Sequence, residues 1–191
     1  SYTTNVAIGY EAGKGLRTAS NSVIIGSSAG TLHTSGGNSV FIGASAGDAV
    51  TTGAGNIMIG QGSDSSSATT SYAIAIGVGA TAEDGGLSMG RSSTAVQDSI
   101  AIGRGTTATG IDAVTIGEGA SGAISSTAIG QGTTAAGGGI ALGKDAAAAA
   151  NSIAIGSSGT AITLSSGQSG GSTTLPVLIN GTQYYIQIHL P

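Results

Sequence analysis

The sequence predicts an all-β protein built as a parallel β-roll, a solenoid of about eleven short repeats. A motif of two apolar residues around a middle position, followed by glycine, recurs eleven times between Gly9 and Gly156. The motif glycines are 17 residues apart in the first four steps and 13 or 14 apart afterwards, and such a short, fixed period is the signature of a solenoid. Composition agrees, because the 191 residues include 36 Gly but no Pro before Pro176, so no proline interrupts a ladder there.

Each repeat supplies a first short strand that ends at the motif glycine. The residues three and one before that glycine are aliphatic in nearly every copy, as in Val40 and Ile42 or Ile100 and Ile102. Residues two apart in a strand share one face. We therefore expect these two columns to point into the core of the roll.

A second strand is predicted after the motif glycine, with small residues three and five positions later, such as Ala80 and Ala82. Large side chains facing small ones would give a thin, flat roll. The glycine itself fits a turn that needs positive φ or a close backbone approach. Asn or Asp, often followed by Ser, stands four or five residues before many of these glycines and is typical of a turn.

The middle residue of the first strand is predicted to face away from the roll's own core. None of the eleven residues in this column is charged and most are apolar, whereas a solvated face would be polar. We predict that the column is buried against other copies of the chain along the whole solenoid, although a chance Ala-rich outer face is the alternative. The predicted subunit interface consists of Ala7, Ile24, Phe41, Met58, Ala75, Ala101, Ala128, Ala141 and Ala154.

The spacing divides the chain into four segments. Residues 1–60 form a β-roll with 17-residue repeats, whose extra residues lie in one connection, and residues 61–164 form a β-roll with 13–14-residue repeats. Residues 165–174 read as a Gly/Ser linker. Residues 175–191 are predicted to form a C-terminal β-hairpin with a two-residue turn at Asn180 and Gly181.

The sequence offers no site for chemistry, so we predict no catalytic, cofactor or metal-binding residues and no enzymatic activity. The segment from Gly138 to Asp145 (GGIALGKD) spells most of a phosphate-binding loop but has Asp145 where Ser or Thr is needed. His33 and His189 are far apart, and there is no Cys. A net charge of −4 with five scattered basic residues argues against nucleic-acid binding. No apolar run is long enough to insert into a membrane.

A column of hydroxyl residues raises a further possibility, because regular Thr ladders on flat sheets can bind ice. Its companion column is not Thr, so an ice-binding solenoid is a less favoured reading. The column, four residues after the later motif glycines, reads Thr81, Thr94, Thr107, Ser121, Thr134, Ala147 and Thr160.

Units such as NSVIIGSSAG, NSVFIGASAG, DSIAIGRGTTATG and NSIAIGSSGTA resemble the head repeats of trimeric autotransporter adhesins, the YadA-like heads. The resemblance covers residues 5–162 and implies a left-handed parallel β-roll trimer, with apolar strands near the axis, that binds host surface structures. The chain departs from that pattern in its 17-residue repeats and in having no neck, stalk or membrane barrel after the repeats. NVAIGYEAGKG and the tail LPVLINGTQYYIQIHL look more like bacteriophage tail-fibre and appendage proteins.

The predicted function is that of a structural and attachment module in a bacteriophage fibre or spike, located in the virion. The expected partners are two further copies of the chain, other virion or surface-structure proteins, and a host cell-surface glycan or protein receptor. The alternative is the head of a bacterial trimeric autotransporter adhesin at the cell surface, binding host matrix or cells. A hydrolase acting on surface glycan is a third, weaker reading, because no carboxylate pair is placed for it.

Overall fold

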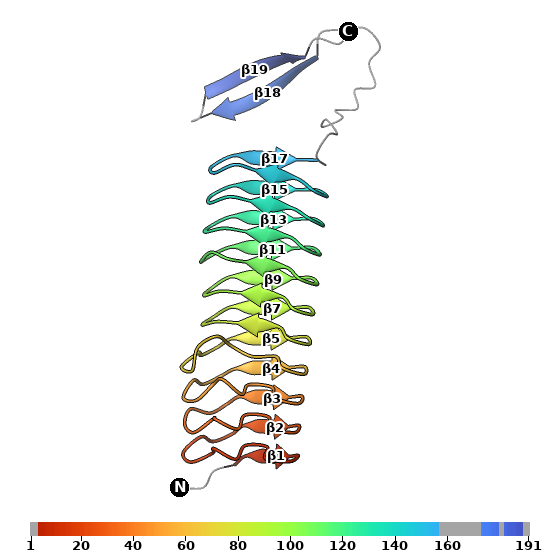
Figure 1. Cartoon of the computed structure of the whole chain (residues 1–191). Coiled ribbons are helices and arrows are strands. Elements are labelled where there is room, and N and C mark those ends of the chain that lie inside the picture. The colour runs from red at the N-terminus through yellow and green to blue at the C-terminus, as the bar shows by residue number, and fades with distance from the viewer. Residues whose placement is uncertain (1–3, 157–172, 180–181, 189–191) are drawn as a thin grey trace. The chain divides into compact units, whose positions relative to one another are not determined.

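The computed structural model describes residues 4–156, 173–179 and 182–188. The described residues contain no helix, and their strands build the predicted all-β parallel solenoid (Figure 1). The chain divides into two compact units, residues 1–160 and 161–191. The first is the roll.

One long parallel sheet holds the first strand of every repeat. Its eleven strands follow each other in chain order, and each pairs in register with the next, so that every motif position forms a column along the sheet. The strands are β1 (Val6–Ile8), β2 (Val23–Ile25), β3 (Val40–Ile42), β4 (Ile57–Ile59), β5 (Ile74–Ile76), β7 (Leu87–Met89), β9 (Ile100–Ile102), β11 (Val114–Ile116), β13 (Thr127–Ile129), β15 (Ile140–Leu142) and β17 (Ile153–Ile155).

A second parallel sheet of six strands lies in the part of the roll that has the shorter repeats. It consists of β6 (Thr81–Ala82), β8 (Thr94–Ala95), β10 (Thr107–Ala108), β12 (Ser121–Gly122), β14 (Thr134–Ala135) and β16 (Ala147–Ala148). Two strands per repeat therefore exist only from β5 onward. The 17-residue layers close through turns that still stack on each other, as when the Gly30 N–H donates to the Ala46 carbonyl at 2.9 Å.

The turns explain why the chain is rich in glycine. Every motif glycine has a φ between +112° and +145°, a region that side chains disfavour. A Cβ on Gly26 would also lie 2.3 Å from the carbonyl oxygen of Gly43 in the next layer. The Asn and Asp residues before the first strand are confirmed as turn residues, because Asn38 and Asp98 have φ values of 56° and 54°, which Asn and Asp tolerate better than most residues.

The structure corrects the predicted faces of the first strand. The middle column points into the roll's own core, and the columns on either side of it point outward. Seven of the predicted interface residues are completely buried within one chain: Ile24, Phe41, Met58, Ala75, Ala101, Ala128 and Ala141. Ala154, in the last layer, is partly buried and packs against the core, and Ala7, in the first layer, is exposed. The middle column therefore packs inside a single chain and is not a subunit interface.

Interior width is the physical reason for this reversal. In the 13-residue layers the middle column faces the small residues of the second sheet, so Ala101 packs with Ala95 and Ala108. Close-packed interiors leave no room for an extra side chain of aliphatic size. The Val and Ile side chains that flank the middle position therefore lie outside. The predicted small, inward-facing columns of the second strand are confirmed, since Ala80, Ala82 and Thr133 are fully buried.

The second unit contains an antiparallel pair of strands, β18 (Thr173–Ile179) and β19 (Thr182–Ile188). Their register places Val177 opposite Tyr184 and Ile179 opposite Thr182. Strand β18 begins at Thr173, inside the segment 165–174 that was predicted as a linker. The predicted turn at residues 180 and 181 and most of the predicted linker lie outside the described residues.

Candidate interaction surfaces

The outward side chains of the long sheet form a continuous apolar surface, called here the apolar face. It contains both outer residues of each of the eleven strands, and Thr127 is the one member that is not aliphatic or Met. The remaining members are Val6, Ile8, Val23, Ile25, Val40, Ile42, Ile57, Ile59, Ile74, Ile76, Leu87, Met89, Ile100, Ile102, Val114, Ile116, Ile129, Ile140, Leu142, Ile153 and Ile155.

No member of the apolar face is buried in the single chain. Ile129 in β13, two layers before the last, is 39% exposed, and Ile153 in the last layer is 68% exposed. Eleven layers at about 4.8 Å each make a strip roughly 50 Å long. With two side chains across, its area is on the order of 500 Å², at the upper end of what a monomeric protein leaves exposed in one patch.

The sequence contained a signal that identifies the correct face. The middle column holds large side chains only in the layers with the 17-residue spacing, namely Ile24, Phe41 and Met58. The size of a side chain at a subunit interface should not depend on the number of residues in its own layer. The size of a side chain inside the layer should depend on it, because a longer layer encloses more space. The large middle residues in the longer layers therefore indicate that the middle column lies inside the roll.

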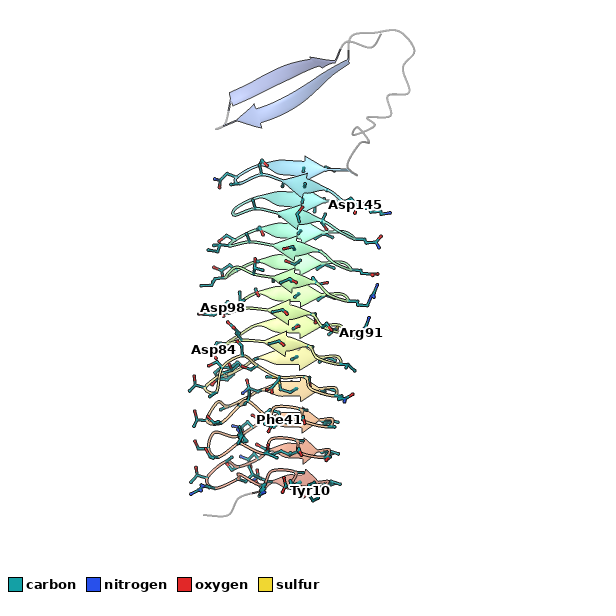
Figure 2. The ribbon with its side chains drawn as sticks, viewed as in Figure 1. Tyr10, Phe41, Asp84, Arg91, Asp98 and Asp145 are labelled. Atoms are coloured by element: carbon teal, nitrogen blue, oxygen red, sulfur yellow. The ribbon has the colours of Figure 1, made fainter. Side chains whose placement is uncertain are left out.

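Charged side chains gather at the two edges of the roll, where the chain turns. Figure 2 shows Asp84 and Asp98 at one edge and Arg91 and Asp145 at the opposite edge. The second edge carries what we call the turn column, the first residue after each motif glycine. In chain order it reads Tyr10, Ser27, Ala44, Gln61, Val78, Arg91, Arg104, Glu118, Gln131 and Lys144.

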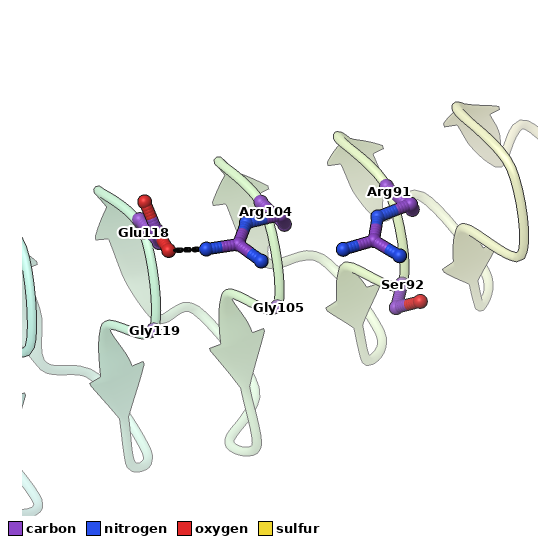
Figure 3. A pocket seen from close by; sticks show the side chains of 6 residues that line it. All are labelled: Arg91, Ser92, Arg104, Gly105, Glu118 and Gly119. Carbon is purple, nitrogen blue, oxygen red and sulfur yellow. Dashed lines mark hydrogen bonds and ion pairs between the residues drawn. The ribbon is translucent and has the colours of Figure 1, made fainter.

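Three adjacent members of the turn column line an open pocket of about 320 Å³ (Figure 3). Arg91, Arg104 and Glu118 supply its charges, and the residues that follow them, Ser92, Gly105 and Gly119, complete the lining. Arg104 forms an ion pair with Glu118, and both side chains are about half exposed. None of the ion pairs among the described residues includes Arg91.

His33 lies inside the roll rather than at a surface. It is fully buried, and its ring meets that of Phe41 edge-on at a centroid distance of 5.2 Å. Neither ring nitrogen has a hydrogen-bond partner among the described residues. Burial lowers the pKa of His33, and the Val50 backbone offsets part of that effect. His33 is therefore a neutral core residue at pH 7 and offers no ligand to the surface.

Other kinds of site find little support in the described part of the chain. It holds no cluster of three His, Cys, Asp or Glu residues that could bind a metal ion. No helix within it could cross a bilayer. The described members of the hydroxyl column face outward on the second sheet, where Thr94 and Thr107 are partly exposed in neighbouring, hydrogen-bonded strands.

Comparison with known proteins gives an informative match among solved structures. No family model matches the sequence, and no curated protein is similar enough in sequence to match. Among solved structures, the chain is similar to the collagen-binding domain of the Yersinia adhesin YadA, with a TM-score of 0.60 over 91% of both chains. The chain has the fold of that YadA domain. The two sequences are 23% identical.

The match to YadA confirms the resemblance that the repeat units indicated, at the level of the fold. The YadA domain is named for collagen binding.

Proposed function

We propose that this chain is the head module of a bacterial surface adhesin, which assembles as a homotrimer and binds a glycan or protein on a host cell or its matrix. The observation that carries the proposal is the apolar face. Both outer columns of all eleven strands are apolar apart from Thr127, although one chain alone leaves them in contact with water. Burial of apolar area on this scale favours association, after the entropy cost of bringing subunits together is subtracted.

The solved structure that this chain matches belongs to a bacterial adhesin, and this supports the adhesin reading over the virion fibre that the sequence first suggested. A fibre module remains the second candidate because of the NVAIGYEAGKG unit and the tail. The reading frame and its neighbours distinguish the two: a stalk and barrel encoded in the same frame support the adhesin, and adjacent virion structural genes support the fibre.

Assembly is tested with a pair of matched variants. Ile102→Asp places a carboxylate on the apolar face, where three copies would bury it without a partner. Thr107→Asp places the same group on the outer face of the second sheet. We expect light scattering to show a trimer for the unmodified chain and for Thr107→Asp, and dissociated chains for Ile102→Asp. A monomeric unmodified chain, or an Ile102→Asp variant that assembles normally, would contradict the proposal.

Attachment is tested separately on surfaces coated with collagen, with other matrix proteins, or with whole cells. We expect saturable binding by the trimer to at least one of these surfaces and none to albumin. Absence of binding to every surface would remove the attachment role while leaving the assembly result intact. The same preparations test the prediction that the chain is not an enzyme, because incubated host glycan should release no sugars.

A further inference from the structure

We propose that the pocket between Arg91, Arg104 and Glu118 binds an acidic saccharide through a carboxylate or sulfate group. The proposal deepens the attachment function proposed above, because it names the class of ligand and the residues that would bind it. It depends on the register of the roll, on the charge balance of the turn column and on the chemistry of the side chains that line the pocket.

Register brings the two arginines together. Arg91 and Arg104 follow consecutive motif glycines, so they occupy the same position in adjacent layers, about 4.8 Å apart along the roll. Their turns are held by backbone hydrogen bonds, since the Gly105 N–H donates to the Arg91 carbonyl and the Gly119 N–H donates to the Arg104 carbonyl, each at 3.0 Å. The two guanidinium groups therefore project from fixed neighbouring positions.

Charge balance sets this pair apart from the two lysines of the roll. Arg17 also belongs to no ion pair among the described residues, but the residue at its position in the next layer is Thr34 rather than a second cation. Lys14 pairs with Glu11 at 2.7 Å, and Lys144 lies 4.0 Å from Asp145. Arg104 pairs with Glu118, but Arg91 has no acidic partner among the described ion pairs. Three consecutive layers thus carry two positive charges, Arg91 and Arg104, and a single negative charge, Glu118. A bound anion would supply the missing negative charge.

The pocket is open to a ligand of this kind. A Cβ built at Gly105 or Gly119 would meet no atom within 4 Å, so no other part of the roll covers these turns. Arginine presents a planar set of donors that binds carboxylate or sulfate oxygens in pairs. Arg104 retains further N–H groups after pairing with Glu118.

The remaining lining favours a saccharide over a simple anion. Glu118 can accept hydrogen bonds from hydroxyl groups, and the Ser92 hydroxyl can donate or accept them. A pocket of about 320 Å³ has room for a sugar ring. A polyhydroxylated ring with one anionic substituent uses all four of these side chains, whereas an acidic peptide side chain uses only the arginines.

The test uses the full chain and three hexasaccharides: a sulfated heparin fragment, a hyaluronate fragment that carries only carboxylates, and neutral maltohexaose. Titration calorimetry should show binding of at least one acidic probe and none of maltohexaose. The acidic probe that binds more tightly identifies sulfate or carboxylate as the preferred group. Affinity should fall as salt rises, because the interaction depends on charge.

Variants assign the site. Arg91→Gln and Arg104→Gln should each weaken binding about tenfold or more, the effect of losing a charge-assisted hydrogen bond. Arg17→Gln removes an exposed cation elsewhere and should leave binding within about twofold of the original. Circular dichroism should show the same β signal for all three variants, because these side chains are exposed.

Three results would overturn the proposal: no binding of either acidic fragment, unchanged affinity in Arg91→Gln, or hexaglutamate binding as tightly as the acidic sugars. Failure here is distinguishable from failure of the attachment function. If Arg91→Gln loses the oligosaccharide but the trimer still attaches to cells, the roll attaches through another surface. If the unmodified chain binds the oligosaccharide but no host surface, the pocket is real and the attachment role is wrong.

Discussion

The 17-residue layers and the 13-residue layers stack in the same long sheet but have different interiors. The wide layers enclose Ile24, Phe41 and Met58, together with Val50 and His33. The narrow layers enclose Ala101, Ala128 and Ala141, which face the small residues of the second sheet. The length of the connection therefore sets the width of the core, and the first strand keeps the same outer columns throughout.

The wide layers also make room by omitting side chains. A Cβ on Gly47 would lie 2.5 Å from the Phe41 ring, and one on Gly30 would lie 2.9 Å from it. The narrow layers hold buried hydroxyl groups, several of which bond within the roll, as when the Ser88 and Ser93 hydroxyls lie 2.7 Å apart in a hydrogen bond. The Thr115 hydroxyl, also buried, has no partner among the described residues. Large apolar groups fill one region, and small or hydrogen-bonded groups fill the other.

The largest expected effect comes from a charge inside the narrow region. Ala101→Asp places a carboxylate where no partner exists, and we expect loss of the folded roll, because burying an unpaired charge costs several kcal/mol, roughly 3–5 or more. Circular dichroism and thermal melting measure this. Ile102→Asp, on the neighbouring residue, should keep the β signal and lose assembly instead. Equal folding of both variants would mean that the faces are wrongly assigned.

A cavity in the wide region should have the next largest effect. Phe41→Ala removes the largest fully buried side chain among the described residues, and we expect a loss of about 3–5 kcal/mol in the free energy of unfolding. Leu32→Ala, in the same part of the roll, shortens an exposed side chain and should change stability by less than about 0.5 kcal/mol. Urea unfolding of the two variants would contradict the comparison if their losses were similar.

Acid should weaken the wide region selectively through His33. Its pKa is lowered in the folded state, so the unfolded chain binds the proton more readily. The stability that neutral His33 contributes is complete above its unfolded pKa of about 6.5 and falls as the pH drops below it, by up to about 1.4 kcal/mol per pH unit. His33→Leu should remove this part of the pH dependence. Burial raises the pKa of Asp64, so its contribution to stability increases as the pH falls. That contribution should be the same in the unmodified chain and in His33→Leu.

The most local of the expected effects concerns packing inside one narrow layer. Gly122 stands where the neighbouring layers have Ala108 and Ala135, and a Cβ there would lie 2.5 Å from the Thr115 hydroxyl oxygen. Gly122→Ala alone should cost about 1–3 kcal/mol from overpacking. In a Thr115→Ala background the closer of two hydroxyls is removed and only the Ser126 oxygen remains near, at 2.9 Å, so the cost should become clearly smaller. A double-mutant cycle with no coupling would contradict this packing.

Most of the roll could be predicted from sequence because each feature is repeated. The motif glycines, the two periods, the small columns of the second strand and the Asn or Asp turns all agree with the structure. The prediction of which side chains of the first strand point inward was wrong. All three residues of most such strands are apolar, as in Ile100, Ala101 and Ile102, so no alternation of polar and apolar residues distinguished the two faces. The size of Phe41 and Met58 beside the longer period was the decisive sign.

The charged pocket was beyond the reach of pattern analysis for a different reason. Equal spacing places Arg91 and Arg104 in one column, and the 14-residue step after Gly103 still leaves Glu118 in it. The ion pair that occupies Arg104 and leaves Arg91 unpaired depends on side-chain conformation. Sequence alone supplies the positions but not that arrangement.

In-register stacking gives the roll a particular response to mechanical load. The backbone hydrogen bonds that join the layers run along the axis of the stack, so a pull on the two ends of the roll loads the layers in series and detaches them one at a time. A narrow layer of 13 residues, once detached and extended, lengthens the chain by about 40 Å, and a 17-residue layer by about 50 Å. We therefore expect a single roll pulled at its two ends to lengthen in small steps, one layer at a time, and to shorten again as the layers refold.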